Sequence, residues 1–259
     1  MRGWKRWVGL SGLGLVLLGL LGFGWVLWAS EPRPRGIRDR EAVEAMARRL
    51  EAAVNLPAWR DGTGAVRWTF AGRRTHLWDR ERGLVQVQWG DRRGLLRIGT
   101  SRGVAFRGDE RVRGPDAEAI LEQTYAAWVN DAFWLNPLAK LRDPGVELRR
   151  VDLDSGETGL LVRYTQGGLT PGDAYLWLFG EEDLPRAWKM WVSNVPVGGM
   201  EVTWEGWKTL STGAVVSTRH ESPPVLTLEL KDVEAAPNLP TLLGDTEDPF
   251  APWLEELGV

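Results

Sequence analysis

The sequence predicts an α+β protein that is mainly β, with about 11–12 antiparallel strands curled into a barrel or half-barrel around one central helix. Three observations support this class. Apolar and polar residues alternate through residues 64–108 and 146–233, with glycine-rich turns between the runs. One long helix-like stretch, Asp116 to Leu135, separates the two regions. So many strands in sequence order must curl, close or split, because a flat open sheet would leave long free edges.

Residues 1–30 predict an N-terminal signal-anchor or transmembrane helix. The chain begins with a basic segment, and from Trp7 to Ala29 there is no charged residue. A stretch of roughly 20 apolar residues is long enough to cross a bilayer, whereas the apolar part of a cleaved signal is about 7–15 residues. We therefore expect a single-pass anchor with the folded domain outside the cytoplasm. Cleavage after Ala29 or Ser30, followed by secretion, is the alternative.

After the anchor we expect a Pro- and Arg-rich linker over residues 31–38 and one folded domain over residues 39–259. An amphipathic helix starts near Asp39, because apolar residues recur with helical spacing up to Val54. Roughly five short strands then precede the central helix. Further strands are expected over residues 146–153, 158–166, 173–179, 186–193, 200–210, 215–221 and 226–233. The apolar residues from Phe250 to Leu257 predict a short final helix that docks on the sheet.

Composition argues against several classes of function. The formal charge of −3 argues against a nucleic-acid partner, whose binding depends on many Lys and Arg side chains at phosphates. The chain has no cysteine and two histidines, so neither a thiolate metal site nor a multi-histidine centre is expected. The folded region contains no nucleophile elbow, P-loop or dinucleotide fingerprint. We therefore expect no catalysis, no metal and no cofactor.

A few polar residues stand out in this apolar pattern. His76 and His220 lie beside charged residues near strand ends, and we expect both to be solvated surface groups. Asn130 and Asp131 interrupt the apolar end of the central helix. They either hold a buried polar network or ligand head group, or make the hydrogen bonds that end the helix and turn the chain. Paired arginines such as Arg73-Arg74 are expected to be solvated or edge-protecting charges.

Three segments carry a resemblance to a known family: TYAAWVNDAFWLNPLAKLRDPGVEL (124–148), GGLTPGDAYLWLF (167–179) and WEGWKTLSTGAVVSTRH (204–220). The chain resembles uncharacterised exported bacterial proteins of the LolA-like and LppX-like, lipoprotein carrier-like superfamily. This resemblance implies a half-barrel with an apolar concave face and a helical lid. LolA itself is released into the periplasm, whereas the leader of this chain predicts an anchor in the bacterial inner membrane with the domain in the periplasm. The lipobox cysteine of some relatives is missing, and no cargo-handling residue of LolA can be placed on this sequence.

We therefore expect a membrane-tethered domain that binds a lipid or other apolar ligand in the half-barrel without catalysis. Burying one CH₂ group contributes about 0.8 kcal/mol, so an acyl chain needs only an apolar slot. The alternative is a structural or interaction module of an envelope complex, whose many tryptophans form a filled core. The candidate cavity residues are Trp68, Trp89, Trp177, Trp188 and Trp204 on the wall and Trp128, Phe133 and Trp134 on the lid.

Overall fold

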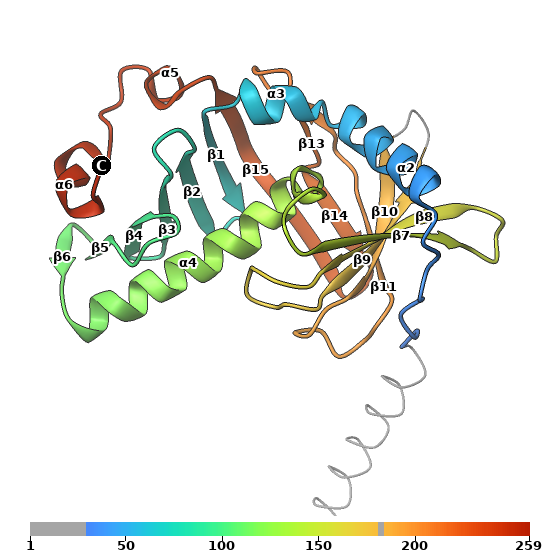
Figure 1. The fold of residues 1–259 in the computed structure, drawn as a ribbon. Helices are drawn as coiled ribbons and strands as arrows, with labels where there is room; N and C mark the ends of the chain where they lie inside the picture. The colour runs from blue at the N-terminus through green and yellow to red at the C-terminus, as the bar shows by residue number, and fades with distance from the viewer. Residues whose placement is uncertain (1–29, 181–183) are drawn as a thin grey trace, which may run out of the picture.

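Two antiparallel sheets form most of the protein, for which we analysed a computed structural model that describes residues 30–180 and 184–259 (Figure 1). The eight-stranded sheet contains, in spatial order, β14 (Arg219–Ser222), β15 (Leu226–Ala236), β1 (Ala65–Phe70), β2 (Arg74–Asp79), β3 (Leu84–Trp89), β4 (Arg92–Arg97), β5 (Gly103–Arg107) and β6 (Glu110–Val112). The five-stranded sheet contains β11 (Met200–Thr203), β10 (Pro185–Trp191), β9 (Ala174–Phe179), β8 (Thr158–Tyr164) and β7 (Val146–Asp152). The predicted α+β, mainly β class is confirmed, and neither sheet closes into a barrel.

The two sheets meet where β11 lies beside β14. Glu205, just after β11, forms an antiparallel bridge with Arg219 at the start of β14. The backbone N–H of Glu221 also donates to Oγ1 of Thr203, at 3.1 Å. A short ribbon of β12 (Lys208–Thr209) and β13 (Val215–Val216) connects these strands along the chain. The chain thus turns from one sheet into the other at this edge.

Most predicted strands are observed, with two differences. The expected strand over residues 200–210 is divided into β11 and β12, because the chain turns at Gly206, whose φ of +62° favours glycine. The expected strand over residues 215–221 is divided into β13 and β14. At this break, Ser217 turns its hydroxyl toward the carbonyl of Glu205, at 2.6 Å. The alternation pattern had located both segments but not the points at which each changes partner.

Helices cover both faces of the eight-stranded sheet. α4 (Pro115–Leu135) crosses the inner face over β3, β4 and β5 and ends between the two sheets (Figure 1). It approaches β4 closely at Gly94, where a Cβ atom would collide with Thr124. The outer face packs against α5 (Leu239–Leu243), η3 (Ala251–Trp253) and α6 (Leu254–Leu257). The sequence predicted such a short terminal helix docked on the sheet.

The N-terminal part of the domain contains two helices where one was predicted. α2 (Arg40–Ala53) begins as expected, with the Asp39 carboxylate accepting from the backbone N–H of Ala42 at 3.1 Å. A second helix, α3 (Leu56–Asp61), follows immediately. α2 ends just before Asn55, and Pro57 lies in the first turn of α3, where the missing proline N–H would have no partner within the helix.

The segment predicted as a linker lies against the outer face of the five-stranded sheet. Ile37 forms an antiparallel bridge with Arg150 of β7. At the other end of the segment, the carbonyl of Glu31 accepts from the indole N–H of Trp191 at 2.8 Å. The predicted transmembrane residues 1–29 lie outside the described residues. Among the residues that the structure does describe, no helix is long and apolar enough to cross a membrane.

A candidate ligand-binding interior

The space between the two sheets and α4 is lined by aromatic side chains. Four predicted wall residues lie there with 0–3% of their surface exposed: Trp68, Trp177, Trp188 and Trp204. The three predicted lid residues, Trp128, Phe133 and Trp134, are partly buried and pack against the same cluster. Trp89, at the end of β3, is partly exposed and is not a member of the cluster. The sequence pattern therefore identified most of the interior, although the residues come from both sheets and from α4.

Trp188 on β10 is at the centre of the aromatic contacts. Its ring centroid lies 5.0 Å from that of Trp177 on β9 and 4.8 Å from that of Trp204. From α4, Trp134 approaches it to 5.0 Å and Phe133 to 5.9 Å. Most of these pairs are tilted or edge-to-face, which is the favoured geometry for aromatic rings. The C-terminal end of α4 is thus held to the five-stranded sheet by ring contacts.

A buried ionic network holds the same end of α4 to the eight-stranded sheet. Both carboxylate oxygens of Asp131 accept hydrogen bonds from Arg74 of β2, at 2.6 and 2.7 Å. The His76 Nε2 atom lies 2.7 Å from Oδ2 of Asp131, and Asn130 donates to Oδ1 at 2.9 Å. Of the two alternatives for Asn130-Asp131, the buried network is the one observed. Asp131 does not end the helix, because α4 continues to Leu135.

The charge states in this network follow from burial and hydrogen bonding. Burial raises the pKa of Asp131, but the hydrogen bonds from His76 and Arg74 outweigh it and hold the pKa below the ordinary value. Burial lowers the pKa of His76, which the bond to Asp131 only partly opposes. His76 is therefore a neutral donor at neutral pH, and its ring stacks on Trp68 with 4.4 Å between centroids.

His220 is also buried, between Trp204 and Trp134, with centroid distances of 4.2 and 5.2 Å. Burial lowers its pKa to about 3, and a nearby backbone group of Thr203 opposes this only in part. The predictions of solvated positions for His76, His220 and Arg74 are wrong. Strand alternation points both histidines inward, and Arg74 reaches the buried carboxylate of Asp131. The alternation of His220 with Arg219 and Glu221 was the signal that could have shown this.

The interior contains buried polar atoms that lack a hydrogen-bond partner in the described part of the chain. They include the indole Nε1 atoms of Trp68, Trp78, Trp128, Trp188 and Trp204, Nδ1 of His76 and both ring nitrogens of His220. Native proteins leave few such atoms, because an unsatisfied buried donor costs about 1–3 kcal/mol. Indole N–H groups are donors only. The interior therefore offers an apolar wall together with several donors that a ligand with acceptor atoms could use.

The interior is filled in this structure by side chains of both sheets and of α2, α3 and α4. Two surface pockets of the described residues lie elsewhere, one on the outer face of each main sheet. No group of three or more His, Cys, Asp or Glu side chains able to hold a metal ion is found in residues 30–180 and 184–259. A molecule could enter this interior only if the packed side chains moved apart, and in residues 30–180 and 184–259 no nucleophile or acid-base pair lies in an open cleft.

These features define the class of protein as a mainly β, two-sheet domain with an aromatic interior under one helix. The sequence matches no protein-family model and no curated protein. Among solved structures, the chain is similar to the crystal structure of a DUF1329 family protein from Desulfovibrio piger, with a TM-score of 0.38 and 9% sequence identity. The match covers 74% of this chain and 92% of that chain.

Proposed function

We propose that the chain is a LolA-like, membrane-tethered extracytoplasmic domain that binds a lipid or other apolar ligand between its two sheets, with α4 as the lid. The observation that carries this proposal is the aromatic interior under α4 with its buried, unpartnered donors. Aromatic walls bind acyl chains by excluding water, and each buried CH₂ group contributes about 0.8 kcal/mol. Ester or hydroxyl oxygens of a lipid would accept hydrogen bonds from the indoles.

The attachment of α4 supports a role as a lid. Its C-terminal end is held by ring contacts to Trp188 and by the Asp131 network, and both are interactions of side chains rather than backbone. Its middle packs on β4 at Gly94 without a hydrogen-bonded ladder. The helix can therefore leave the sheets without breaking any strand pairing. A ligand would replace the ring contacts of Phe133 and Trp134 with its own apolar surface.

The direct experiment is lipid extraction and mass spectrometry of the full chain, purified in mild detergent from the expressing cells. We expect a co-purified lipid at a fixed ratio to protein. Trp134→Ala removes a lid indole and is expected to lower that ratio. Trp253→Ala is the matched control, because it removes a partly buried indole on the outer face, against Phe106. Absence of bound lipid in repeated preparations would defeat the proposal.

A filled structural core is the second candidate, and one observation favours it. The wall tryptophans are already buried by the protein itself, with 0–3% exposure.

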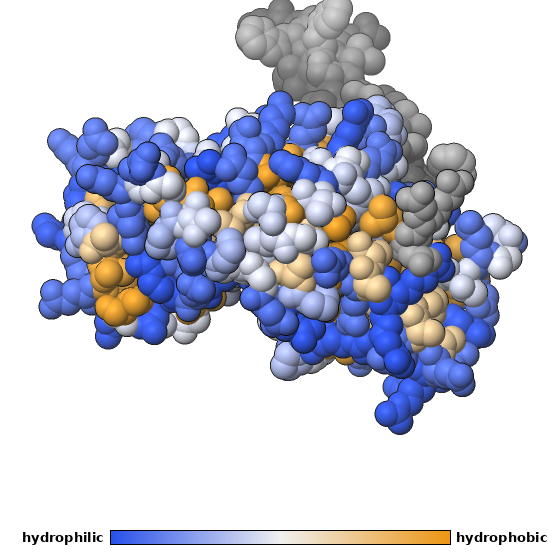
Figure 2. All heavy atoms as spheres, turned by 90° about the horizontal axis from the view of Figure 1, so that it is seen from above, coloured by the Kyte–Doolittle hydropathy of each residue, from blue (hydrophilic) through white to orange (hydrophobic). Residues whose placement is uncertain are grey.

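An interaction module would also need an exposed apolar patch on its surface. On the face shown in Figure 2, hydrophobic residues form small groups among hydrophilic ones. The exposed large hydrophobic residues of the described chain lie on separate segments: Ile37, Tyr125, Leu169, Val225 and Val259.

The location is part of the same proposal. We place residues 1–30 in the bacterial inner membrane as a single-pass anchor, with the domain in the periplasm. An alkaline phosphatase fused after Val259 is expected to be active, since that enzyme needs an oxidising compartment, and a fused reporter that works only in the cytoplasm should be inactive. The opposite pair of results would contradict this orientation.

A further inference from the structure

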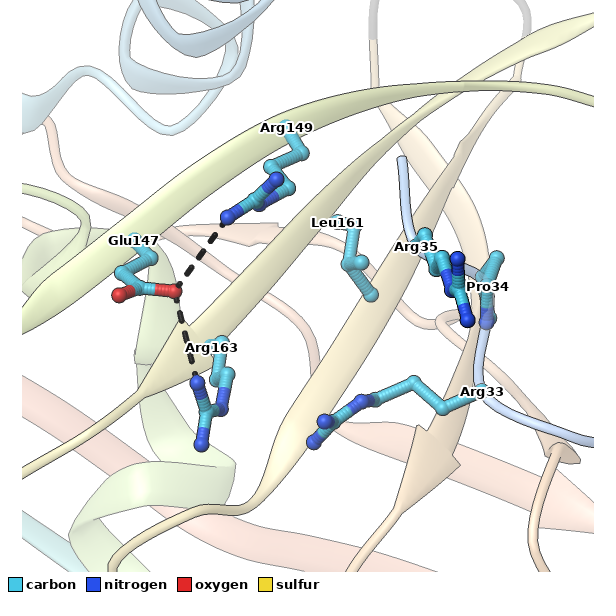
Figure 3. Close-up of a pocket in the computed structure, with 7 residues that line it drawn as sticks. All are labelled: Arg33, Pro34, Arg35, Glu147, Arg149, Leu161 and Arg163. Carbon is cyan, nitrogen blue, oxygen red and sulfur yellow. Dashed lines mark ion pairs between the residues drawn. The ribbon is translucent and has the colours of Figure 1, made fainter. Parts of the chain in front are cut away.

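One of the two surface pockets lies on the outer face of the five-stranded sheet, away from the aromatic interior. Its volume is about 460 Å³, and Figure 3 shows its lining: Arg33, Pro34 and Arg35 from the N-terminal segment, Glu147 and Arg149 from β7, and Leu161 and Arg163 from β8. The N-terminal segment forms one wall and the two strands form the other. Leu161 lies between the two walls.

Strand register explains why these side chains meet. Glu147 of β7 is opposite Arg163 of β8, and Arg149 is opposite Leu161. These residues alternate with Leu148 and its neighbours, which point into the interior cluster. The two cross-strand pairs therefore share the outer face. They form a small square with two guanidinium groups, one carboxylate and one apolar side chain.

The N-terminal segment is held over this square by its backbone. Gly36 has a φ of +64°, which favours glycine, and a Cβ atom there would lie 2.7 Å from Cβ of Arg149. The bridge between Ile37 and Arg150 fixes the next residue on the edge of β7. Arg33 and Arg35 are thereby positioned on the side of the pocket opposite Arg149 and Arg163 (Figure 3).

The charges in the pocket are unbalanced. Four arginines face one carboxylate, and Glu147 is only loosely paired, at 3.6 Å from Arg163 and 4.0 Å from Arg149. Among the described residues, no carboxylate pairs with Arg33 or Arg35. The Arg163 Nε atom is buried and has no hydrogen-bond partner in that part of the chain. Arg150, next to Arg149 on β7, also has an unpartnered Nε atom, but its terminal nitrogens are paired with Asp39 and Asp152.

We propose that this pocket binds a phosphate-bearing anion, either free phosphate or the phosphate of a lipid headgroup. Guanidinium groups match phosphate oxygens with paired hydrogen bonds, and several of them around one pocket favour an anion of more than one negative oxygen. Leu161 and the CH₂ groups of the arginine side chains provide an apolar contact for the carbon next to a phosphate ester. A bound phosphate would replace Glu147 as the partner of Arg149 and Arg163.

The test is titration calorimetry on the full chain in detergent with three probes. These are inorganic phosphate, dihexanoyl phosphatidylglycerol, and dihexanoylglycerol, which has the same chains without phosphate. We expect at least one phosphate probe to bind and dihexanoylglycerol not to bind at this site. The double variant R149Q/R163Q should weaken binding of that phosphate probe about tenfold or more, as expected for lost charge-assisted hydrogen bonds. The matched control R67Q/R219Q removes two exposed arginines from the other sheet and should change the affinity less than about twofold.

A second variant separates ligand binding from a structural role. Glu147→Gln removes the carboxylate that competes with the anion, so phosphate should bind about threefold more tightly. If the arginines served only to stabilise the strands through Glu147, the affinity would not rise. Tighter binding of inorganic phosphate than of the lipid identifies free phosphate as the ligand class, and the reverse order identifies a headgroup; either supports the proposal. No binding of either phosphate probe, or equal weakening in R67Q/R219Q, overturns it.

Discussion

Nε2 of His76 on β2 lies 2.7 Å from the carboxylate of Asp131 on α4, and this contact joins the helix to the sheet beneath it. Arg74, two residues earlier on the same strand, binds both oxygens of that carboxylate. This buried network lies at the helix end that covers the aromatic interior, whereas Arg92 of β4 donates to the side-chain carbonyl of Gln123 on α4 at an exposed position, at 3.0 Å. Opening of the interior has to separate Asp131 from His76 and Arg74.

Asp131→Asn should destabilise the protein by about 3 kcal/mol, because it leaves the guanidinium of Arg74 without a counter-charge next to a buried site. The free energy of unfolding can be measured by urea titration with tryptophan fluorescence. Glu122→Gln, at an exposed position of the same helix, is the control and should change stability by less than about 0.5 kcal/mol. Equal effects of the two variants would show that the network contributes nothing.

Stability should fall as the pH falls from 7.5 to 5. In the unfolded chain His220 takes up a proton below about pH 6.5, whereas in the folded chain its pKa is about 3. A histidine with a lowered folded pKa stabilises the protein above its unfolded pKa, and this contribution is lost as the pH decreases toward the folded pKa. At pH 5 the loss from His220 is about 2 kcal/mol. His76, whose pKa is also lowered, acts in the same direction.

His220→Phe should remove most of this pH dependence, because the variant keeps an aromatic ring between Trp134 and Trp204 but cannot bind a proton. Urea titrations of wild type and variant at pH 7.5 and pH 5 provide the comparison. The remaining slope of the variant is assigned to His76. A variant whose stability falls as much as that of the wild type would contradict the burial of His220.

Gly94→Ala should destabilise the protein by about 3 kcal/mol, because the new Cβ atom collides with Thr124 and pushes α4 away from β4. The helix displacement should also increase quenching of the interior tryptophans by acrylamide. Gly72→Ala is the matched control. Gly72 has a positive φ of 63° but nothing within 4 Å of the added atom, so only backbone strain of about 1 kcal/mol is expected and quenching should not change. Equal quenching in the two variants would mean that α4 does not control access.

The sequence predicted the order of the elements well because alternation and turn residues are local signals. The strands from Val146 to Val233 and the central helix were located within a few residues. Most of the interior was also predictable, since Trp68, Trp177 and Trp188 occupy the inward positions of apolar strands. Trp89 shares that alternation, but its place at the end of β3 leaves it partly exposed.

The polar part of the interior could not be predicted, because it depends on contacts between distant residues. His76 and Asp131 are 55 positions apart, and only the packing of α4 on β2 brings a carboxylate to the imidazole. The outer pocket could not be predicted either, because it also depends on residues that are far apart in the sequence. Arg33 and Arg163 line the same pocket because the N-terminal segment runs over the outer face of the five-stranded sheet and is bridged to β7, and a Pro- and Arg-rich composition alone indicates only an extended linker.

The central claim is that an apolar chain enters the interior when α4 moves, and a locked lid tests it most directly. The chain has no native cysteine, and a Cβ atom at Gly94 would lie 2.9 Å from Cβ of Thr124, so the double variant G94C/T124C can form a disulfide after a small shift of the helix. The measurement is quenching of tryptophan fluorescence by dibromostearate in the oxidised and reduced forms of this full-length variant. Quenching of tryptophans elsewhere is common to both forms and cancels in the comparison. We predict strong quenching in the reduced form and a large loss of it in the oxidised form; equal quenching in both forms, or none in either, would contradict the account.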